Sequence, residues 1–128
     1  MPKIQLQPAS LRVPPAPYVP GTKRGPFVFT ADQVSVDKDN QVVGEGDIRA
    51  QTRQVLKNIE AVLREGGATF ADVMKTTVYL TDIKNFAAMN EVYAEVFGKD
   101  KPGRTTVEAK LASPKFLVEI EAIAVTKD

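Results

Sequence analysis

The sequence predicts an α+β fold, in which two α-helices pack on one face of a mixed β-sheet. Two segments have apolar residues at helical spacing, and three others are rich in β-branched and apolar residues without proline or glycine. In chain order they read strand, helix, strand, helix and strand, so both helices can cover the same face of one sheet. The length of 128 residues predicts a single domain, residues 1–128.

The N-terminal segment, residues 1–26, holds seven of the nine prolines and is therefore expected to be extended or loop rather than helical. Tyr18 lies between Pro17 and Pro20, so its backbone has little freedom and its ring is held in one place. One interpretation makes this ring an aromatic plug over the edge of the core.

Strand and turn patterns follow the proline-rich segment. Residues 27–31 predict a strand, and residues 33–36 predict its continuation or its neighbour. The run Asp-Lys-Asp-Asn at residues 37–40 predicts a turn, after which residues 41–43 return as a short strand. Residues 72–80 predict a further strand, between the two helices.

Capping residues and apolar spacing predict the two helices. Asp47 is a candidate N-cap of the first helix, and the glycines at residues 66–67 end it. The second helix begins at Asp82 or Asn85 and ends at Gly98. Its apolar stripe includes one polar residue, Asn90, which must be hydrogen-bonded if it is buried. The stripes are Ile48, Thr52, Val55, Leu56, Ile59, Val62 and Leu63 for the first helix, and Phe86, Met89, Asn90, Tyr93, Val96 and Phe97 for the second.

The last predicted strand, residues 117–125, carries two carboxylates on an otherwise apolar face. Alternation places Glu119 and Glu121 together with Ile123, opposite the apolar set Val118, Ile120, Ala122 and Ala124. Such carboxylates are costly to bury unless they are paired or hydrogen-bonded. Arg104 follows a Pro-Gly turn at the start of another strand and is placed to offer its planar fork to a carboxylate. A structural salt bridge is one interpretation, and a ligand carboxylate is the other.

The composition excludes several kinds of chemistry. The chain has no Cys and no His, which removes disulfides, thiolate catalysis, Ser-His triads and the usual zinc ligand sets. The net charge of +1 disfavours nucleic acid as a partner, and the basic face of the first helix is expected to be an ordinary solvated face. No apolar run is long enough to span a membrane and no signal segment is present, so a cytoplasmic location is expected.

Several segments resemble the reactive intermediate deaminase family, also called Rid or YjgF-like. The family's Pro-x-Arg-[Ser/Thr]-x-Val-Glu turn is present at residues 102–108, and its terminal Val-Glu-Ile-Glu-Ala-Ile-Ala strand at residues 118–124. The resemblance continues, in the family's order and at its spacing, through residues 16–18, 51–58, 72–80 and 89–93.

This resemblance implies a chorismate-mutase-like fold and a homotrimer with three sites in the clefts between subunits. The face of the last strand that carries Leu117, Ile123 and Val125 would then be buried between subunits rather than under the helices. The resemblance also implies hydrolysis of reactive 2-imino or enamine acids, such as 2-aminoacrylate, to a 2-keto acid and ammonia, with no cofactor and no metal. The alternative is a trimeric module that binds small carboxylates or proteins without turnover. RNA cleavage is disfavoured because the net charge is near zero and His is absent.

The same resemblance assigns roles to individual residues. Arg104 would clamp the substrate carboxylate bidentately. Glu119 would position or deprotonate the attacking water, or protonate the leaving amine. Tyr18 would border the site, Asn90 would lie at the cleft between subunits, and Thr106 stands where many members carry Cys.

Residues 31–33 read Ala-Asp-Gln where the family usually has Ser-Gly-Gln. Ala31 therefore lacks a hydroxyl at the expected substrate site, and Asp32 adds a carboxylate. If Asp32 points into the cleft, its charge would weaken simple imino acids and favour a substrate with a cationic or hydrogen-bond-donating side chain. The alternative is that Asp32 points to solvent, or pairs with a nearby Lys or Arg.

Overall fold

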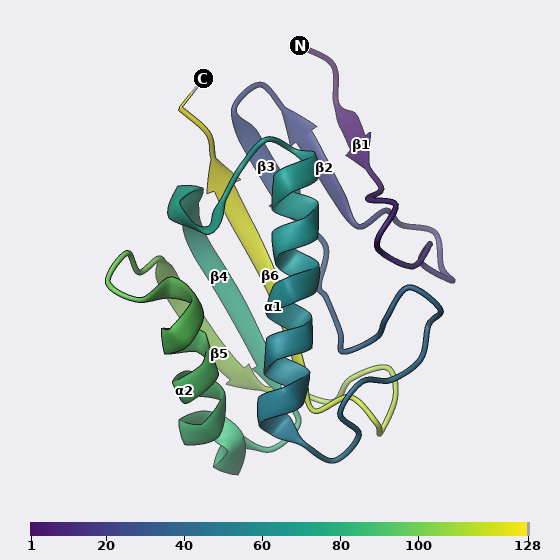
Figure 1. Ribbon diagram of the computed structural model, residues 1–128, viewed down its shortest axis with the longest axis vertical. Coiled ribbons are helices and arrows are strands. Elements are labelled where there is room, and N and C mark those ends of the chain that lie inside the picture. Colours follow the sequence, from purple (N-terminus) through teal and green to yellow (C-terminus); the bar gives the residue numbers. More distant parts are fainter. Residues whose placement is uncertain (128) are drawn as a thin grey trace.

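The computed structural model describes residues 1–127, and it has two layers (Figure 1). A six-stranded mixed sheet forms one layer, and both α-helices lie on one face of it, which confirms the predicted architecture. The elements in chain order are β1 (Ile4–Leu6), β2 (Gly21–Arg24), β3 (Phe27–Thr30), α1 (Ile48–Glu65), β4 (Val73–Leu80), α2 (Phe86–Phe97), β5 (Gly103–Glu108) and β6 (Val118–Val125), with 3₁₀ turns at Phe70–Asp72 and Ile83–Asn85.

The strand order across the sheet is β1-β2-β3-β6-β4-β5. All neighbouring strands are antiparallel except β4 and β5, which are parallel because α2 makes the crossover between them. β6, the last strand in the chain, therefore lies in the interior of the sheet, between β3 and β4. The two ends of the sheet are β1 and β5, and the open face of the sheet is the one opposite the helices.

The structure corrects the prediction in two N-terminal regions. Short strands β1 and β2 form within the proline-rich segment, where no strand pairing was predicted. Residues 33–36 and 41–43 are not regular strands but contribute two isolated bridges, Gln33 to Ile120 and Val36 to Val42. The buried side chain of Asn58 donates hydrogen bonds to Val34 O and Val36 O (3.1 and 3.0 Å), so a helix side chain takes the place of a neighbouring strand.

The predicted limits of both helices are confirmed. Asp47 caps α1 by accepting a hydrogen bond from the Ala50 N–H (3.1 Å), and Gly66 follows its last turn. The second helical segment begins at both predicted residues. Asp82 accepts a hydrogen bond from the Lys84 N–H at the start of the 3₁₀ turn, and Asn85 directly precedes α2.

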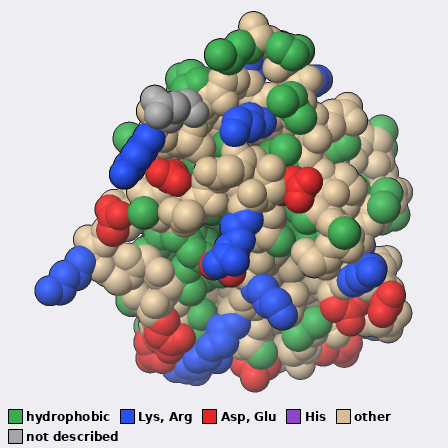
Figure 2. All heavy atoms as spheres, turned by 45° about the horizontal axis from the view of Figure 1, so that its top comes forward, with side chains coloured by type: hydrophobic (Ala, Val, Ile, Leu, Met, Phe, Trp, Pro, Cys, Tyr) green, Lys and Arg blue, Asp and Glu red, His purple; other side chains and the backbone are tan. Residues whose placement is uncertain are grey.

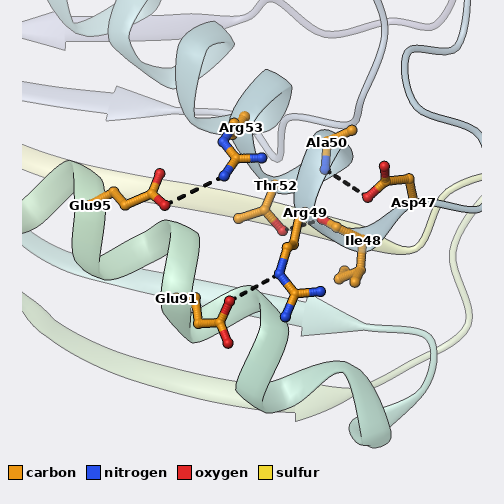
Figure 3. Close-up of polar contacts among 8 residues, drawn as sticks. All are labelled: Asp47, Ile48, Arg49, Ala50, Thr52, Arg53, Glu91 and Glu95. Carbon is orange, nitrogen blue, oxygen red and sulfur yellow. Dashed lines mark hydrogen bonds and ion pairs between the residues drawn. The ribbon is translucent and has the colours of Figure 1, made fainter.

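The basic face of α1 is held against α2 by exposed ion pairs (Figure 3). Arg49 Nε lies 2.9 Å from Glu91 Oε2, and Arg53 lies 3.4 Å from Glu95 Oε1. Exposed pairs of this kind contribute little to stability, because water and salt screen them. The arginines are exposed and bind glutamates of this chain, which agrees with the predicted ordinary solvated face. No aromatic side chain lies between them in α1 that could stack on bases.

At Gly21, β2 lies tightly against α1. A Cβ at this position would lie 2.3 Å from Val62 Cγ1 and 2.9 Å from the Phe29 carbonyl oxygen, too close for any side chain. We expect Gly21→Ala to lower the free energy of unfolding by about 1–3 kcal/mol, measured by denaturant titration. Gly103→Ala is the matched control, because the nearest atoms there are at 3.7 Å. Equal losses in the two variants would contradict a tight contact at Gly21.

Candidate functional site

Arg104 lies on the face of β5 that α2 covers. Its guanidinium carbon is 4.7 Å from the centroid of the Tyr93 ring and 5.5 Å from that of the Phe86 ring. The hydroxyls of Tyr93 and Thr76, the register partner of Arg104 on β4, are hydrogen-bonded at 2.6 Å, which holds the Tyr93 ring in place. Within residues 1–127, Arg104 forms no ion pair and donates no hydrogen bond, so the predicted structural salt bridge is wrong. The fork is oriented by ring stacking and remains available to an anion.

Two further polar groups on this side of the sheet lack partners. Asn90 on α2 and Arg104 line the same pocket, of about 280 Å³. Asn90 Oδ1 is buried without a hydrogen bond, so the interpretation that it ties the helix to a strand is wrong. Thr106 follows Arg104 by two residues and shares its face of β5, and its buried Oγ1 is also unpartnered. Buried polar atoms without partners are costly, so this group is suited to a polar ligand.

Glu119 lies on the open face of the sheet. The flanking Val118 and Ile120 are fully buried under the helices, so alternation turns Glu119 and Glu121 the other way, as predicted. The Tyr79 hydroxyl, from the neighbouring strand β4, donates a 2.8 Å hydrogen bond to Glu121 Oε1. Arg104 and Glu119 therefore point to opposite faces of the sheet and do not meet within one chain.

Asp32 joins the two glutamates on the open face. Gln33 and Ile120 exchange two backbone hydrogen bonds (2.8 and 3.2 Å), which fixes the segment after β3 against β6. Asp32 Oδ1 is buried and finds no donor, and no Lys or Arg within residues 1–127 forms an ion pair with Asp32. The predicted pairing of Asp32 with a Lys or Arg is therefore wrong, and its side chain is half-buried, with Oδ1 enclosed.

The crowding of these acidic groups changes their titration. Burial, and then repulsion from the neighbouring Asp32 and Glu121, raises the pKa of Glu119 to about 7. Burial, followed by repulsion from Glu121, also raises the pKa of Asp32. The hydrogen bond to Glu121 raises the pKa of the Tyr79 hydroxyl to about 12. Glu119 is therefore partly protonated near neutral pH.

Tyr18 and Ala31 line an open groove of about 610 Å³ beside β2 and β3. Tyr18 is 42% exposed, which contradicts the interpretation of its ring as a plug over the core. Tyr18 also lines a small cavity with Asp32. The predicted site residues thus fall into two groups: Asn90, Arg104 and Thr106 beside α2, and Tyr18, Ala31, Asp32 and Glu119 beside the groove and the open face.

Two polar members of the open-face cluster were not predicted as site residues. Glu121 was recognised only as a member of a strand face, and Tyr79 only as part of a strand. Their contact depends on the register of β4 against β6, in which Tyr79 pairs with Glu119. The alternation in β6 could have identified Glu121 as a neighbour of Glu119 on the same face. No local sequence pattern indicates that Tyr79 lies in the cluster. Among residues 1–127, no set of three acidic side chains is arranged to hold a metal ion.

The chain is similar over most of its length to several known proteins. The model of the family described as endoribonuclease L-PSP matches residues 10–126. A RutC family protein of Pyrococcus horikoshii is 50% identical over 111 residues, which are 87% of this chain and 88% of the relative. The structure of YyfA from Yersinia pestis, of the conserved Rid protein family, is 35% identical, with a TM-score of 0.91 and 98% and 100% of the two chains covered. The structure of Escherichia coli TdcF with bound serine is 31% identical, with a TM-score of 0.89 and 97% and 99% covered.

Proposed function

Because this chain belongs to the endoribonuclease L-PSP family, which includes the Rid, YjgF and RutC proteins, we propose that it hydrolyses reactive 2-imino and enamine acids to 2-keto acids and ammonia. The observation that carries this proposal is the Arg104 guanidinium, stacked on Tyr93 and without an internal anionic partner. A planar fork of this kind suits the carboxylate that all these substrates share. The relative TdcF was solved with serine, an amino acid that has the same group.

The proposed site lies between two copies of the chain. Arg104 and Glu119 point to opposite faces of the sheet, so one copy supplies the arginine and a neighbouring copy supplies the glutamate. The open face has large exposed apolar side chains suited to burial between copies. They are Phe27, Phe29, Val107 and Ile123. A homotrimer with three such clefts, as the family resemblance implies, is the assembly that we propose.

The chemistry requires little more than orientation. Arg104 holds the substrate carboxylate and so places the adjacent imine carbon in the cleft, within reach of Glu119. A water adds to this carbon, and Glu119 supplies a proton to the imine nitrogen. The resulting carbinolamine then loses ammonia to leave the 2-keto acid. Such imines also hydrolyse unaided, so positioning and modest electrostatic stabilisation are adequate without His, Cys or a metal.

The test is a direct assay of imine loss. An amino-acid oxidase generates 2-iminopropanoate from alanine in situ, and its disappearance is followed with and without this protein. We expect faster loss with the wild type and no acceleration with Arg104→Ala. If calorimetry detects binding of pyruvate but imine loss is unchanged, the alternative of a small-carboxylate-binding module replaces the enzyme.

RNA cleavage, which the family's description names, has less support. Lys and Arg side chains are interspersed with Asp and Glu on the face drawn in Figure 2, rather than gathered into a basic surface for a phosphate backbone. The chain also contains no His to act in cleavage.

No helix within residues 1–127 combines the length and apolar character needed to cross a bilayer.

A further inference from the structure

We propose that Asp32 and Glu119 share one proton and act as a general acid–base pair in the imine hydrolysis proposed above, on which this inference rests. Glu119 gives its proton to the imine nitrogen, while Asp32 takes a proton from the attacking water. Asp32 stands where the family resemblance leads us to expect glycine, so the pair is a feature of this chain's own sequence.

The backbone places the two carboxyls together. The hydrogen-bonded bridge between Gln33 and Ile120 joins the segment after β3 to the middle of β6. Because Ile120 is buried beneath the helices, the residues on either side of each bridge member turn to the open face. In the antiparallel register of this bridge, Asp32 lies opposite Glu121 and diagonal to Glu119, so the backbone sets its position near both carboxylates.

The other groups around the pair leave its proton in place. Tyr79 on β4 donates its hydroxyl proton to Glu121, the other carboxylate on β6, and is thus already committed. Arg12 lines the small cavity that Asp32 and Tyr18 share, but it donates to Asn40 and forms no ion pair with Asp32. Asp32 Oδ1 is buried without a donor, and because Glu121 already accepts from Tyr79, we assign the carboxyl of Glu119 as the donor to Asp32. In the proposed assembly, a neighbour's Arg104 is neutralised by the substrate carboxylate.

The titration of the two groups supports this arrangement. Burial, followed by repulsion from the neighbouring carboxylates, raises the pKa of both carboxyls, for Glu119 to about 7. Two like charges held this close cannot both ionise readily, so the pair loses its protons in separate steps. At neutral pH one proton remains available to the substrate.

The pair balances both halves of the reaction. In the first half, the water oxygen bonds to the imine carbon, Asp32 accepts a water proton and Glu119 protonates the nitrogen. In the second half, Asp32 protonates the amine as the carbon–nitrogen bond breaks, and Glu119 accepts the proton of the carbinolamine hydroxyl as the carbonyl forms. Ammonia and the 2-keto acid leave, and the pair returns to its initial state without any further reactant.

The test is the pH dependence of kcat for wild type, Asp32→Asn and Asp32→Gly. Activity of the wild type should fall as the pH rises through the last ionisation of the pair, because Glu119 then lacks its proton. Both variants remove the charge that repels the Glu119 carboxylate, so this falling limb should move to lower pH by roughly one unit or more. At pH 8, kcat should fall by about 10- to 100-fold. Asp32→Glu should restore part of the wild-type profile, and the exposed Asp39→Asn should leave it unchanged.

A second measurement separates this inference from the proposed function. The carboxyl ¹³C resonance of Glu119, assigned with Glu119→Gln, should titrate near pH 7 in the pyruvate-bound wild type and at lower pH in Asp32→Asn. Two results would overturn the proposal that the two carboxyls share a proton. One is a Glu119 resonance that titrates at the usual pH of a glutamate in the wild type. The other is an active Asp32→Asn variant in which the falling limb of the kcat profile stays at the wild-type pH. A wild type that does not accelerate imine loss would overturn the proposed function, whereas the resonance would still support or overturn the shared proton.

Discussion

Arg104→Ala is expected to abolish imine hydrolysis while the fold remains intact. Arg104 forms no ion pair or hydrogen bond within residues 1–127, so its removal leaves no internal anion unpaired. The loss of a bidentate contact to the substrate carboxylate should cost about 2–5 kcal/mol of binding. The measurement is kcat/KM for 2-iminopropanoate loss, with circular dichroism and thermal unfolding to establish that the variant is folded.

Arg104→Lys distinguishes the fork from its charge. Lysine keeps the positive charge but has neither the planar donors nor the guanidinium that stacks on Tyr93, so we expect it to recover little activity. Near-normal turnover in Arg104→Ala would remove Arg104 from the site altogether, and full activity in Arg104→Lys would show that charge alone is sufficient.

Mixing two inactive variants tests whether the site is shared between copies. Arg104→Ala and Glu119→Gln, unfolded and refolded together, should regain activity because some clefts then combine an intact arginine with an intact glutamate. For random assembly of a cyclic trimer, this is about a quarter of the clefts. Each variant refolded alone is the control. If the mixture remains as inactive as its components, the two residues do not act from different copies.

Ile123→Glu is expected to break the assembly and, with it, the activity. Ile123 pairs with Phe29 on the open face, and the two side chains are 37% and 41% exposed in the single chain. A carboxylate there would be buried without a partner between copies, yet it would be solvated in a monomer. Light scattering should give three times 14.0 kDa for the wild type and 14.0 kDa for the variant.

The control for Ile123→Glu is Ile4→Glu on β1. Ile4 is 52% exposed, and because it lies two residues from the buried Leu6 it is on the helix side of the sheet. This variant should keep the mass and activity of the wild type. A monomeric wild type would rule out the trimer and a site between copies, and a trimeric, fully active Ile123→Glu would show that copies do not pack through the open face.

The helices and the two faces of the last strand were determined by local sequence. Asp47 and Gly66 mark the ends of α1 because a cap depends only on residues within a turn. The alternation around Glu119 likewise fixes which side chains share a face of β6, whatever its neighbours are. The candidate site residues came from motif resemblance, and composition excluded other chemistry.

Only the tertiary structure decided how these residues are combined. Strands β1 and β2 are too short to be recognised from their own residues and exist because each pairs with a neighbour. The separation of Arg104 from Glu119 follows from the strand registers. On β4 their partners are Thr76 and Tyr79, which are three residues apart and therefore on opposite faces. Likewise, the position of Asp32 beside the glutamates of β6 depends on one backbone bridge between segments far apart in the chain, and pairings of such long range leave no periodic signal in the sequence.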